Sequence, residues 1–332
     1  GEPRFSPAGM RPLPPLVACA LLAAQLVVRA WGDEVQEWQT PMTVVGREFH
    51  SNHAKTIALA PLSGTWPHPV TFHTFWDNLD HLTEKHIMAL RSLHLTNVVH
   101  AVAQRKVVLW TFKKWDDSNN FVQQVRSYAE IRMFSFDAEL PGSPFPLDDK
   151  HVMHQRKMGP TFSTDLVRHL LLWSYGGLWF DLDTLFFRDF DPLFHAYHDQ
   201  VYAYVWDRTD FPNSAILYSL EPRSPAMTAV CNYLVRKGGG FGYKQAHFTF
   251  ASKVPLTVFP VSWFDAGWVG NPRHVSFLHF FKKSKEQYIG DFLPGAFSFH
   301  WHNQWKTTID ETSPARQIMN KLEKSAAITV YP

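Results

Sequence analysis

The chain has 332 residues, of which 45% are hydrophobic and 15% aromatic, a composition that indicates a folded globular protein and excludes a disordered one. Its formal net charge is only +2 and no block of like charges occurs, so we expect no nucleic-acid partner. The length allows one large domain or two small ones.

The N-terminal part of the chain is predicted to be a targeting segment. An apolar stretch at residues 16–28 has about the length of a signal-peptide core and is short for a membrane span. Val28 and Ala30 suit the small-residue rule for cleavage. A cleaved signal peptide and an uncleaved membrane anchor near residues 13–29 therefore both stay open.

This leader also sets the expected domain division and compartment. We assign residues 1–60 to the leader and a stem, and residues 61–332 to a single domain. Either kind of leader directs the chain into the secretory pathway. An anchor predicts a Golgi membrane protein whose domain faces the lumen, whereas cleavage predicts a secreted protein.

From residue 70 onward, predicted strands alternate with predicted helices. Apolar and aromatic runs and helical spacing indicate strands at 70–76, 107–112 and 131–136, and helices at 81–95 and 119–129. Strands separated by helix-length segments are typical of βαβ units with a parallel sheet. The stretch 137–160, which holds four Pro and two Gly, is predicted to be a long functional loop.

The next segment, residues 162–190, reads FSTDLVRHLLLWSYGGLWFDLDTLFFRDF and carries the most informative pattern. Thr164 is predicted to cap a helix that runs to about Tyr175. Gly176 then suits a left-handed C-cap, and a buried strand begins at Leu178.

The rest of the chain contains further elements of the same kinds. They are strands at 201–206, 215–218 and 297–301, a helix at 225–236 and a flexible loop at 238–242. We therefore predict an α/β fold with a mostly parallel, Rossmann-like central sheet and flanking helices.

Asp181 and Asp183 follow the strand that begins at Leu178. Alternate residues of a strand point to one side, so the two carboxylates are expected to converge at an exposed strand end while Leu182 packs inward. Ligands of open α/β sheets bind at such carboxyl ends. Two carboxylates about 4 Å apart repel by roughly 4 kcal/mol at an effective dielectric of 20, and a cation between them would offset that cost. Hard oxygen ligands suit Mg²⁺ or Mn²⁺, either of which can hold a nucleotide diphosphate.

The residues around this pair resemble the sugar-binding region of glycosyltransferases with a DXD motif. The family pattern reads roughly S-D-x-x-R-x-x-x-L-x-x-x-G-G-x-Y-x-D-x-D. Thr164 stands here for the Ser, and Trp179 for the Tyr. The group includes α-1,4-galactosyltransferases, α-1,4-N-acetylglucosaminyltransferases and fungal initiating mannosyltransferases. The positions that carry the resemblance are Asp165, Arg168, Gly176, Gly177, Asp181 and Asp183.

This resemblance implies a GT-A-like fold and a metal-dependent hexosyltransferase. Such an enzyme would move a sugar from a nucleotide-sugar, expected to be UDP-linked, to a hydroxyl of a glycan or glycolipid, with retention of anomeric configuration. Asp181 and Asp183 would bind Mn²⁺ or Mg²⁺, while Asp165 and Arg168 would hold the hydroxyls of the donor sugar, with Gly176-Gly177 in the same donor-binding region. No residue is assigned as a nucleophile.

A weaker resemblance extends over about residues 68–310. The segment FHTFW looks like the family's first strand, whose end lies near the nucleotide base, and would bring His73 and Trp76 to the donor. Asn213 in FPNSAILYS looks like the Asn before the acceptor-side strand. The family often has a Gly-Pro near its acceptor helix, where this chain has GYKQAHFTF, so the resemblance does not identify the acceptor.

The late segment FSFHWHNQW, residues 297–305, resembles the part of the family that closes over the diphosphate. It would bring His300, Asn303 and Trp305 to the donor and His302 to the metal. An imidazole can complete a metal's ligand set or donate to a phosphate oxygen, and an indole N–H can only donate.

Several of these residues have structural alternatives. His73 would then be core packing, Arg168 an intrahelical partner of Asp165, and the late histidines part of a plain edge strand.

Two other functions stay open. The run LWFDLDTLF also resembles the D-x-D strand of haloacid-dehalogenase phosphatases, in which Asp181 would be the nucleophile and Asp183 the general acid. That motif usually opens its domain and continues Gly-Thr-Leu, whereas here a helix precedes it and no Gly follows. The other alternative is a catalytically inactive carbohydrate-binding homologue on the same fold.

Overall fold

The structure is a computed structural model that describes residues 66–157, 160–199, 201–205, 212–237, 256–259, 261–265, 267, 276–285 and 296–330. The predicted leader, stem and anchor, and the predicted loop at 238–242, lie outside the described residues. Within the described part of the chain, no helix is long and apolar enough to cross a membrane.

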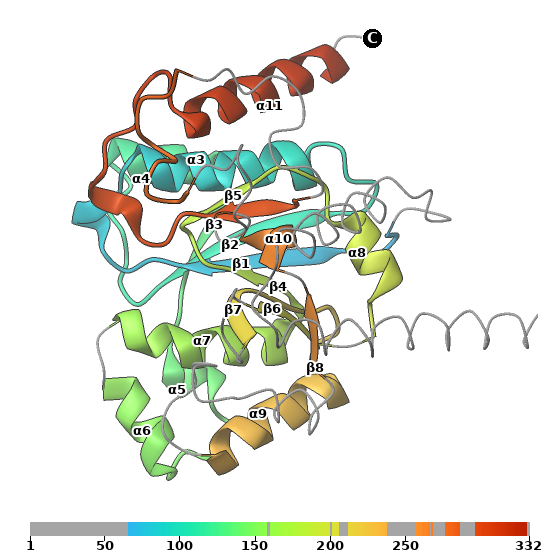
Figure 1. Cartoon of the computed structure of the whole chain (residues 1–332). Coiled ribbons are helices and arrows are strands. Elements are labelled where there is room, and N and C mark those ends of the chain that lie inside the picture. The colour runs from blue at the N-terminus through green and yellow to red at the C-terminus, as the bar shows by residue number, and fades with distance from the viewer. Residues whose placement is uncertain are drawn as a thin grey trace, which may run out of the picture. The chain divides into compact units, whose positions relative to one another are not determined.

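A seven-stranded sheet forms the centre of the described domain, in the order β3-β2-β1-β4-β7-β6-β8 (Figure 1). Neighbouring strands run parallel except at β7, which is antiparallel to both β4 and β6. The predicted α/β class with a mostly parallel, Rossmann-like sheet is thus confirmed. The strands are β1 (Val70–Phe75), β2 (Arg105–Thr111), β3 (Glu130–Met133), β4 (Gly177–Phe180), β6 (Val201–Val205), β7 (Pro212–Ser219) and β8 (Leu256–Phe259).

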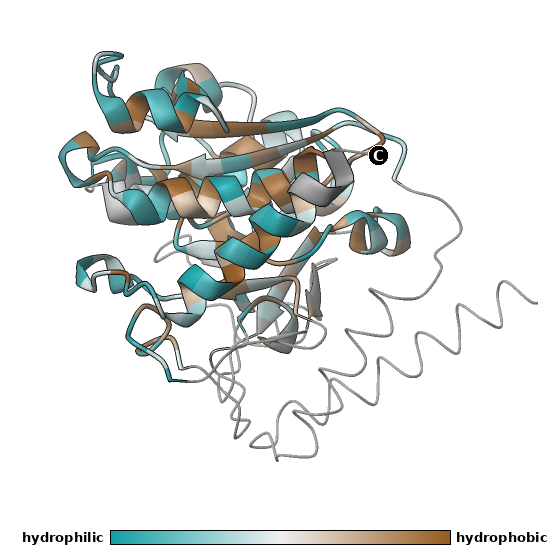
Figure 2. Ribbon diagram, turned by 90° about the horizontal axis from the view of Figure 1, so that it is seen from above, coloured by the Kyte–Doolittle hydropathy of each residue, from teal (hydrophilic) through white to brown (hydrophobic). Residues whose placement is uncertain are grey.

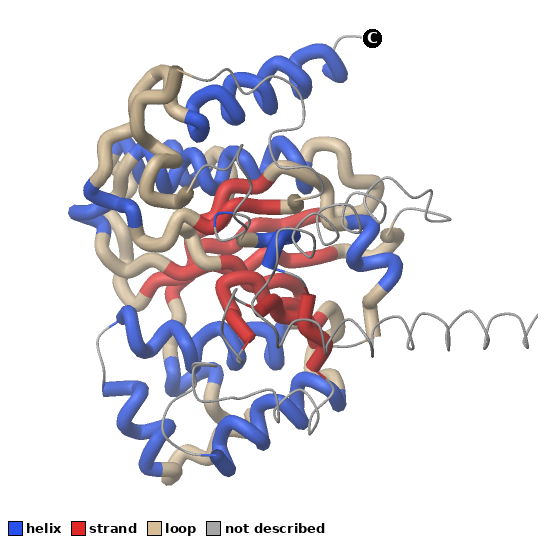
Figure 3. The backbone as a smooth tube through the Cα atoms, viewed as in Figure 1, coloured by secondary structure: helices blue, strands red, loops and turns tan. Residues whose placement is uncertain are grey.

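Helices cover both faces of this sheet, as the tube in Figure 3 also shows. One face carries α3 (Glu84–Leu93) and α4 (Asn120–Arg126), and α11 (Pro314–Val330) packs on the outer side of α3. The other carries α5 (Phe136–Glu139), α6 (Lys150–Lys157), α7 (Pro160–Tyr175) and α9 (Pro225–Lys237). Apolar and polar residues alternate around these helices (Figure 2), as expected for helices that bury one side against a sheet.

A second, two-stranded sheet lies beside the first and joins distant parts of the chain. It pairs β5 (Thr184–Phe186) with β9 (Ser298–His300) in antiparallel register, so that Thr184 lies opposite His300. Two short helices are α8 (Asp191–Ala196) and α10 (Val261–Phe264). The sequence did not predict β5, β8 or α11.

Two local predictions between residues 137 and 175 were wrong. The expected long loop contains α6, because the Asp149 carboxylate accepts from the backbone N–H groups of His151 and Val152 at 2.8 and 3.1 Å and so caps a helix. Helix α7 begins at Pro160, so Thr164 lies inside the helix instead of capping it. Proline suits a first helical position, since its missing N–H would have no partner there.

The turn from α7 to β4 has the predicted left-handed glycine. Gly176 has φ +66° and donates its N–H to the Leu172 carbonyl at 3.0 Å, which ends the helix. Gly177 has φ +98°, and a Cβ there would lie 2.1 Å from the Thr71 carbonyl oxygen of β1. The two glycines therefore let β4 pair directly beside β1, which fixes where β4 ends.

Candidate active site

The carboxylates of Asp181 and Asp183 lie where the chain leaves β4 and crosses to β5. Neither belongs to a strand, so strand alternation is not what directs them. They nevertheless converge with His300: one ligand atom from each of the three side chains lies within 4.8 Å of the others. Leu182 packs inward as predicted and is 4% exposed.

Asp181 is held by residues close to it in the sequence. Its Oδ1 accepts from the indole Nε1–H of Trp179 at 2.8 Å and lies 3.4 Å from Nη1 of Arg168. Its backbone N–H donates to the Ala215 carbonyl on β7 at 2.8 Å. With 29% of its side chain exposed, Asp181 lies at the accessible side of the site.

Arg168 connects helix α7 to this carboxylate. Its guanidinium lies 3.1 Å from Asp165 one turn earlier, so the intrahelical pair exists together with the contact to Asp181. Nη1 also donates to the carbonyl and hydroxyl oxygens of Ser214 at 2.7 and 2.8 Å, and the group lies 5.2 Å above the Trp179 ring. Arg168 is therefore a fixed positive charge next to Asp181, and its side chain is only 7% exposed. The Asp165 side chain is more accessible, at 31% exposed.

Asp183 is buried and held by a segment far away in the sequence. Its Oδ1 lies 3.1 Å from Nε2 of His300, and its Oδ2 accepts from the backbone N–H of Asn303, 120 positions later, at 2.7 Å. The antiparallel pairing of β5 and β9 brings this segment into place. Asp183 therefore does not lie at an exposed strand end, and that expectation was wrong for this residue.

Burial and charge act against each other in the Asp183–His300 pair. Burial alone would raise the pKa of Asp183, but the adjacent His300 and the Asn303 N–H bring it down to about 2. Burial would lower the pKa of His300, but the carboxylates of Asp183 and Asp265 raise it well above its ordinary value. In the absence of a cation the two groups therefore form a buried ion pair.

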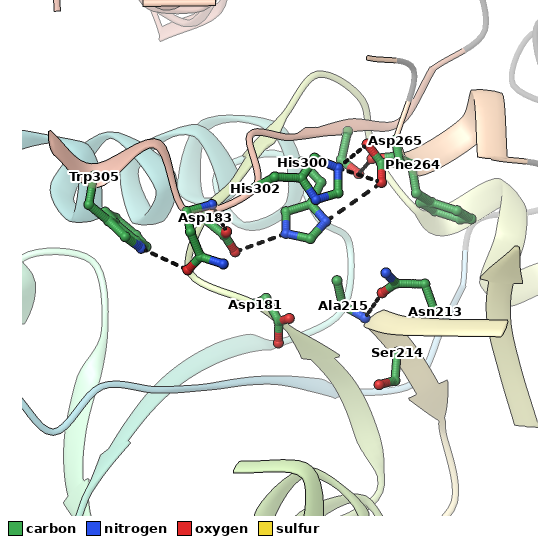
Figure 4. A network of polar contacts seen from close by, with 12 residues as sticks. Asp181, Asp183, Asn213, Ser214, Ala215, Phe264, Asp265, His300, His302 and Trp305 are labelled. Atoms are coloured by element: carbon green, nitrogen blue, oxygen red, sulfur yellow. Dashed lines mark hydrogen bonds and ion pairs between the residues drawn. The ribbon is translucent and has the colours of Figure 1, made fainter. Parts of the chain in front are cut away.

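The structure adds one acidic residue that the sequence did not indicate. Asp265, which directly follows α10, is fully buried and lies 2.9 Å from Nε2 of His302 and 3.7 Å from Nδ1 of His300. Burial would raise the pKa of Asp265, but His302 and His300 lower it. In Figure 4, His300 lies between Asp183 and Asp265 and contacts both, and His302 lies beside His300. The only sequence signal was an acid that ends an apolar run, LTVFPVSWFD, a feature it shares with Asp181.

His302 lies apart from the position predicted for it. The predicted metal set was Asp181, Asp183 and His302, whereas the imidazole that meets the two carboxylates is that of His300. The reason is the turn after β9, where His302 and Asn303 adopt left-handed φ values of +48° and +57°. This turn directs His302 to Asp265, with which it and His300 form a second group of possible metal ligands.

The aromatic residues predicted near the donor form a cluster beside Asp183. Trp305 stacks on His86 with ring centroids 4.2 Å apart, and Trp76 lies 5.1 Å from Trp305. The Trp305 Nε1–H donates to the Asn303 side-chain oxygen at 3.1 Å, instead of pointing to an open site. Nδ1 of His86 accepts from the Thr83 backbone N–H at 3.0 Å.

Two further predicted residues have partners within the protein. The His73 imidazole contacts the Gly176 carbonyl through Nε2 and accepts from the Trp110 indole through Nδ1, both at 3.0 Å, which leaves neither ring nitrogen for a ligand. Burial lowers the pKa of His73 to about 4, so this ring is neutral packing under the glycine turn. The Asn213 side chain accepts from the Ala215 backbone N–H at 2.6 Å (Figure 4). The Ala215 carbonyl in turn accepts from the Asp181 backbone N–H, so Ala215 connects Asn213 to Asp181.

Comparison with known proteins identifies part of this region. Residues 98–199 match the family model of the glycosyltransferase sugar-binding region containing a DXD motif, a range that includes Asp165, Arg168, Asp181 and Asp183. No curated protein matches the chain.

The solved structures that are similar to this chain include several glycosyltransferases. The apo-form glycosyltransferase GlyE of Streptococcus pneumoniae TIGR4 is 13% identical with a TM-score of 0.44, covering 80% of this chain and 65% of that one. An active-site mutant of LgtC is 11% identical with a TM-score of 0.40, covering 77% and 96%. Mouse xyloside xylosyltransferase 1 is 13% identical with a TM-score of 0.41, covering 59% and 87%.

Proposed function

We propose that the chain is a metal-dependent hexosyltransferase, because its residues 98–199 match the family model of the glycosyltransferase sugar-binding region containing a DXD motif. The donor would be a nucleotide-sugar, UDP-linked, and the acceptor a hydroxyl of a glycan or glycolipid. One observation carries the proposal: Asp181, Asp183 and His300 bring ligand atoms within 4.8 Å of one another at the carboxyl end of β4.

This donor set fits a divalent cation. Two carboxylates supply the hard oxygen ligands that Mg²⁺ and Mn²⁺ prefer, and an imidazole favours Mn²⁺, because Mg²⁺ is bound mainly by oxygen. A cation would also relieve the repulsion between two carboxylates that lie close together. When bound there, Mn²⁺ would neutralise the negative charge that grows on a departing nucleoside diphosphate.

The residues of α7 would bind the sugar. Asp165 has a partly exposed carboxylate that can accept hydrogen bonds from sugar hydroxyls, whereas the Arg168 guanidinium is only 7% exposed. We therefore assign the sugar contact to Asp165 and give Arg168 the role of holding Asp165 and Asp181 in register. Arg168 also offsets part of the negative charge that the acidic residues bring together.

The segment after β9 would close the other side of the site. Trp305, Trp76 and His86 form an apolar wall next to Asp183, and such a wall excludes water from the diphosphate. Retention of the anomeric configuration is proposed from the family resemblance alone. The secretory, Golgi-type location and the leader stay predictions, because residues 1–60 lie outside the described part of the chain.

The proposal can be tested on the whole chain with a panel of nucleotide-sugars and Mn²⁺. We expect slow release of a nucleoside diphosphate from one donor, loss of that release in EDTA, and no release of phosphate from p-nitrophenyl phosphate. Asp148→Asn, which changes an exposed carboxylate before α6, is the control and should behave as wild type. Metal-dependent phosphate release from the ester would instead support the phosphatase, and donor binding without turnover an inactive homologue.

A further inference from the structure

Asp265 is a fully buried carboxylate next to the proposed metal ligands, and the proposed function gives it no task. It cannot reach the Asp181–Asp183 pair itself, because His300 lies between them (Figure 4). Its neighbours are the side chains of Tyr204 on β6 and of His300 and His302.

The hydrogen bonds of Asp265 have only one possible direction. An ionised carboxylate has acceptors and no donor, so every polar neighbour must donate to it. The Tyr204 hydroxyl, 3.3 Å from Oδ2, therefore donates its proton to Asp265. The Tyr204 oxygen is then the acceptor in its 3.1 Å contact with His300, so Nδ1 of His300 must carry a proton.

This direction decides what the other nitrogen of His300 can do. A neutral imidazole with its proton on Nδ1 has its lone pair on Nε2, the atom that lies 3.1 Å from Asp183. That lone pair is what a metal ion needs. The same rule makes Nε2 of His302 a donor to Asp265 at 2.9 Å, so that nitrogen is not a metal ligand.

We propose that Asp265 is a positioning residue which, through the Tyr204 hydroxyl, holds His300 in the Nδ1–H tautomer and so makes Nε2 a ligand for the divalent cation. The inference rests on the proposed function, since it assumes a cation at Asp181, Asp183 and His300. Partners of this kind behind metal-bound histidines affect metal affinity by about 10- to 100-fold. A second cation shared by Asp265, His300 and His302 would instead require His300 to lose both of its ring protons.

The test is a titration of the whole chain with Mn²⁺ in the absence of nucleotide. The electron paramagnetic resonance signal of free Mn²⁺ measures how much of the ion is unbound. In Asp265→Asn, the amide N–H₂ can donate to Tyr204, whose hydroxyl then donates to Nδ1 and moves the His300 proton to Nε2. We expect the dissociation constant for Mn²⁺ to rise by about 10- to 100-fold, with one site per chain before and after the change. Tyr204→Phe removes the bridging hydroxyl and should weaken binding in the same direction.

Two controls separate positioning from other roles. His302→Gln keeps an N–H donor toward Asp265 and should bind Mn²⁺ within about threefold of wild type, a small part of the effect expected at Asp265. Asp191→Asn removes another buried carboxylate, the partner of Arg105, near the opposite ends of the strands, and should lower thermal stability without changing Mn²⁺ affinity.

Wild-type affinity in Asp265→Asn would overturn the proposal, and so would two Mn²⁺ sites of which this variant loses one. If Asp265→Asn shows no cooperative thermal unfolding, Tyr204→Phe carries the test, and unchanged affinity in that variant would overturn the proposal. Asp183→Asn and His300→Ala report on the proposed function separately. If neither changes Mn²⁺ binding, the metal site itself fails, whatever Asp265 does.

Discussion

Asp181 and Asp183 are two residues apart, yet the protein holds them in different ways. Asp181 is 29% exposed at its side chain and is held by Trp179 and Arg168, which are near it in the sequence. Asp183 is 7% exposed at its side chain and is held by His300 and Asn303 from the far end of the domain. One carboxylate thus belongs to a local motif and the other to a tertiary contact. The motif shows that both residues are acidic, but only the tertiary contact shows that Asp183 forms a buried ion pair with His300.

The largest expected difference is in stability. Asp181→Asn and Asp183→Asn should each lower kcat/KM by about 10³-fold, which corresponds to roughly 4 kcal/mol of transition-state stabilisation. Asp183→Asn should also cost about 3 kcal/mol of unfolding free energy, because it leaves a buried His300 without its partner. Asp181→Asn should cost less than about 1 kcal/mol, since its side chain is partly exposed. Urea unfolding of the metal-free variants measures both values, and equal losses of stability would contradict this contrast.

The second prediction concerns pH and the metal. Because the pKa of His300 is raised well above its ordinary value, Mn²⁺ must displace a proton from His300, and the apparent dissociation constant of Mn²⁺ should fall by up to about tenfold for each unit of pH below the folded-state pKa of His300. The change follows from one proton released per ion bound. Calorimetric titration at several pH values measures it, and His300→Gln should remove most of the slope. A flat profile in wild type would show that His300 is already neutral.

The metal-free protein should show the opposite trend. The raised pKa of His300 gives stability that is complete below about 6.5, its unfolded value, and is lost as the pH rises through the folded value. The lowered pKa of Asp183 gives stability that is complete above about 3.9 and is lost as the pH falls toward about 2. Both contributions are therefore complete only between these unfolded values, and thermal unfolding in EDTA should show the pair's stabilisation there.

A smaller effect is expected on the Asp181 side. Arg168→Lys keeps the charge but cannot hold Asp165, Asp181 and Ser214 together, because lysine lacks the planar fork of guanidinium. We expect the KM for the nucleotide-sugar to rise about tenfold, or about 1.4 kcal/mol. The affinity for the nucleoside diphosphate, which has no sugar, should fall less than the affinity for the nucleotide-sugar, because only the effect through Asp181 remains. Arg223→Lys, at an exposed arginine next to Trp173, is the matched control.

The smallest effect is expected at Trp305, whose indole N–H donates to the side chain of Asn303, the residue whose backbone N–H donates to Asp183. Trp305→Phe keeps a ring on His86 but loses the indole N–H that Asn303 accepts. A net hydrogen bond contributes about 0.5–1.5 kcal/mol, so the dissociation constant of Mn²⁺ should rise only about threefold. Trp115→Phe serves as the control, because the indole N–H of Trp115 has no partner among the described residues. A loss as large as that of Asp183→Asn would mean that Trp305 acts on the metal site directly.

The parts of the fold that follow from local patterns were predictable. Apolar runs located β1, β2 and β4, and the glycine pair located the end of α7, because steric limits on φ act within a few residues. Helix α6 was missed, since a single capping aspartate outweighed the expectation from nearby prolines. Strand β5 has only three residues, too few for periodicity to identify.

The candidate site, like the fold, has residues whose contacts follow from a local motif and residues whose contacts do not. Asp165, Arg168 and Asp181 lie within one motif, and their contacts follow from its spacing. The sequence could name His300 as a candidate, but it could not tell His300 from His302, because the left-handed turn at His302 decides which ring faces the carboxylates. Asp265 comes from a third segment with no spacing relation to the other two, so only the folded chain identifies it.

The pairing of β5 with β9 also has a consequence for the order in which the protein is made. The ribosome completes β1, β2 and β4 long before residues 298–303, which supply both side-chain and backbone partners of Asp183. Until that segment emerges, β5 has no strand partner among the described residues and Asp183 stays hydrated. A nascent chain can therefore build most of its central sheet before the proposed metal site can form, because that site waits for the synthesis of residues 298–303.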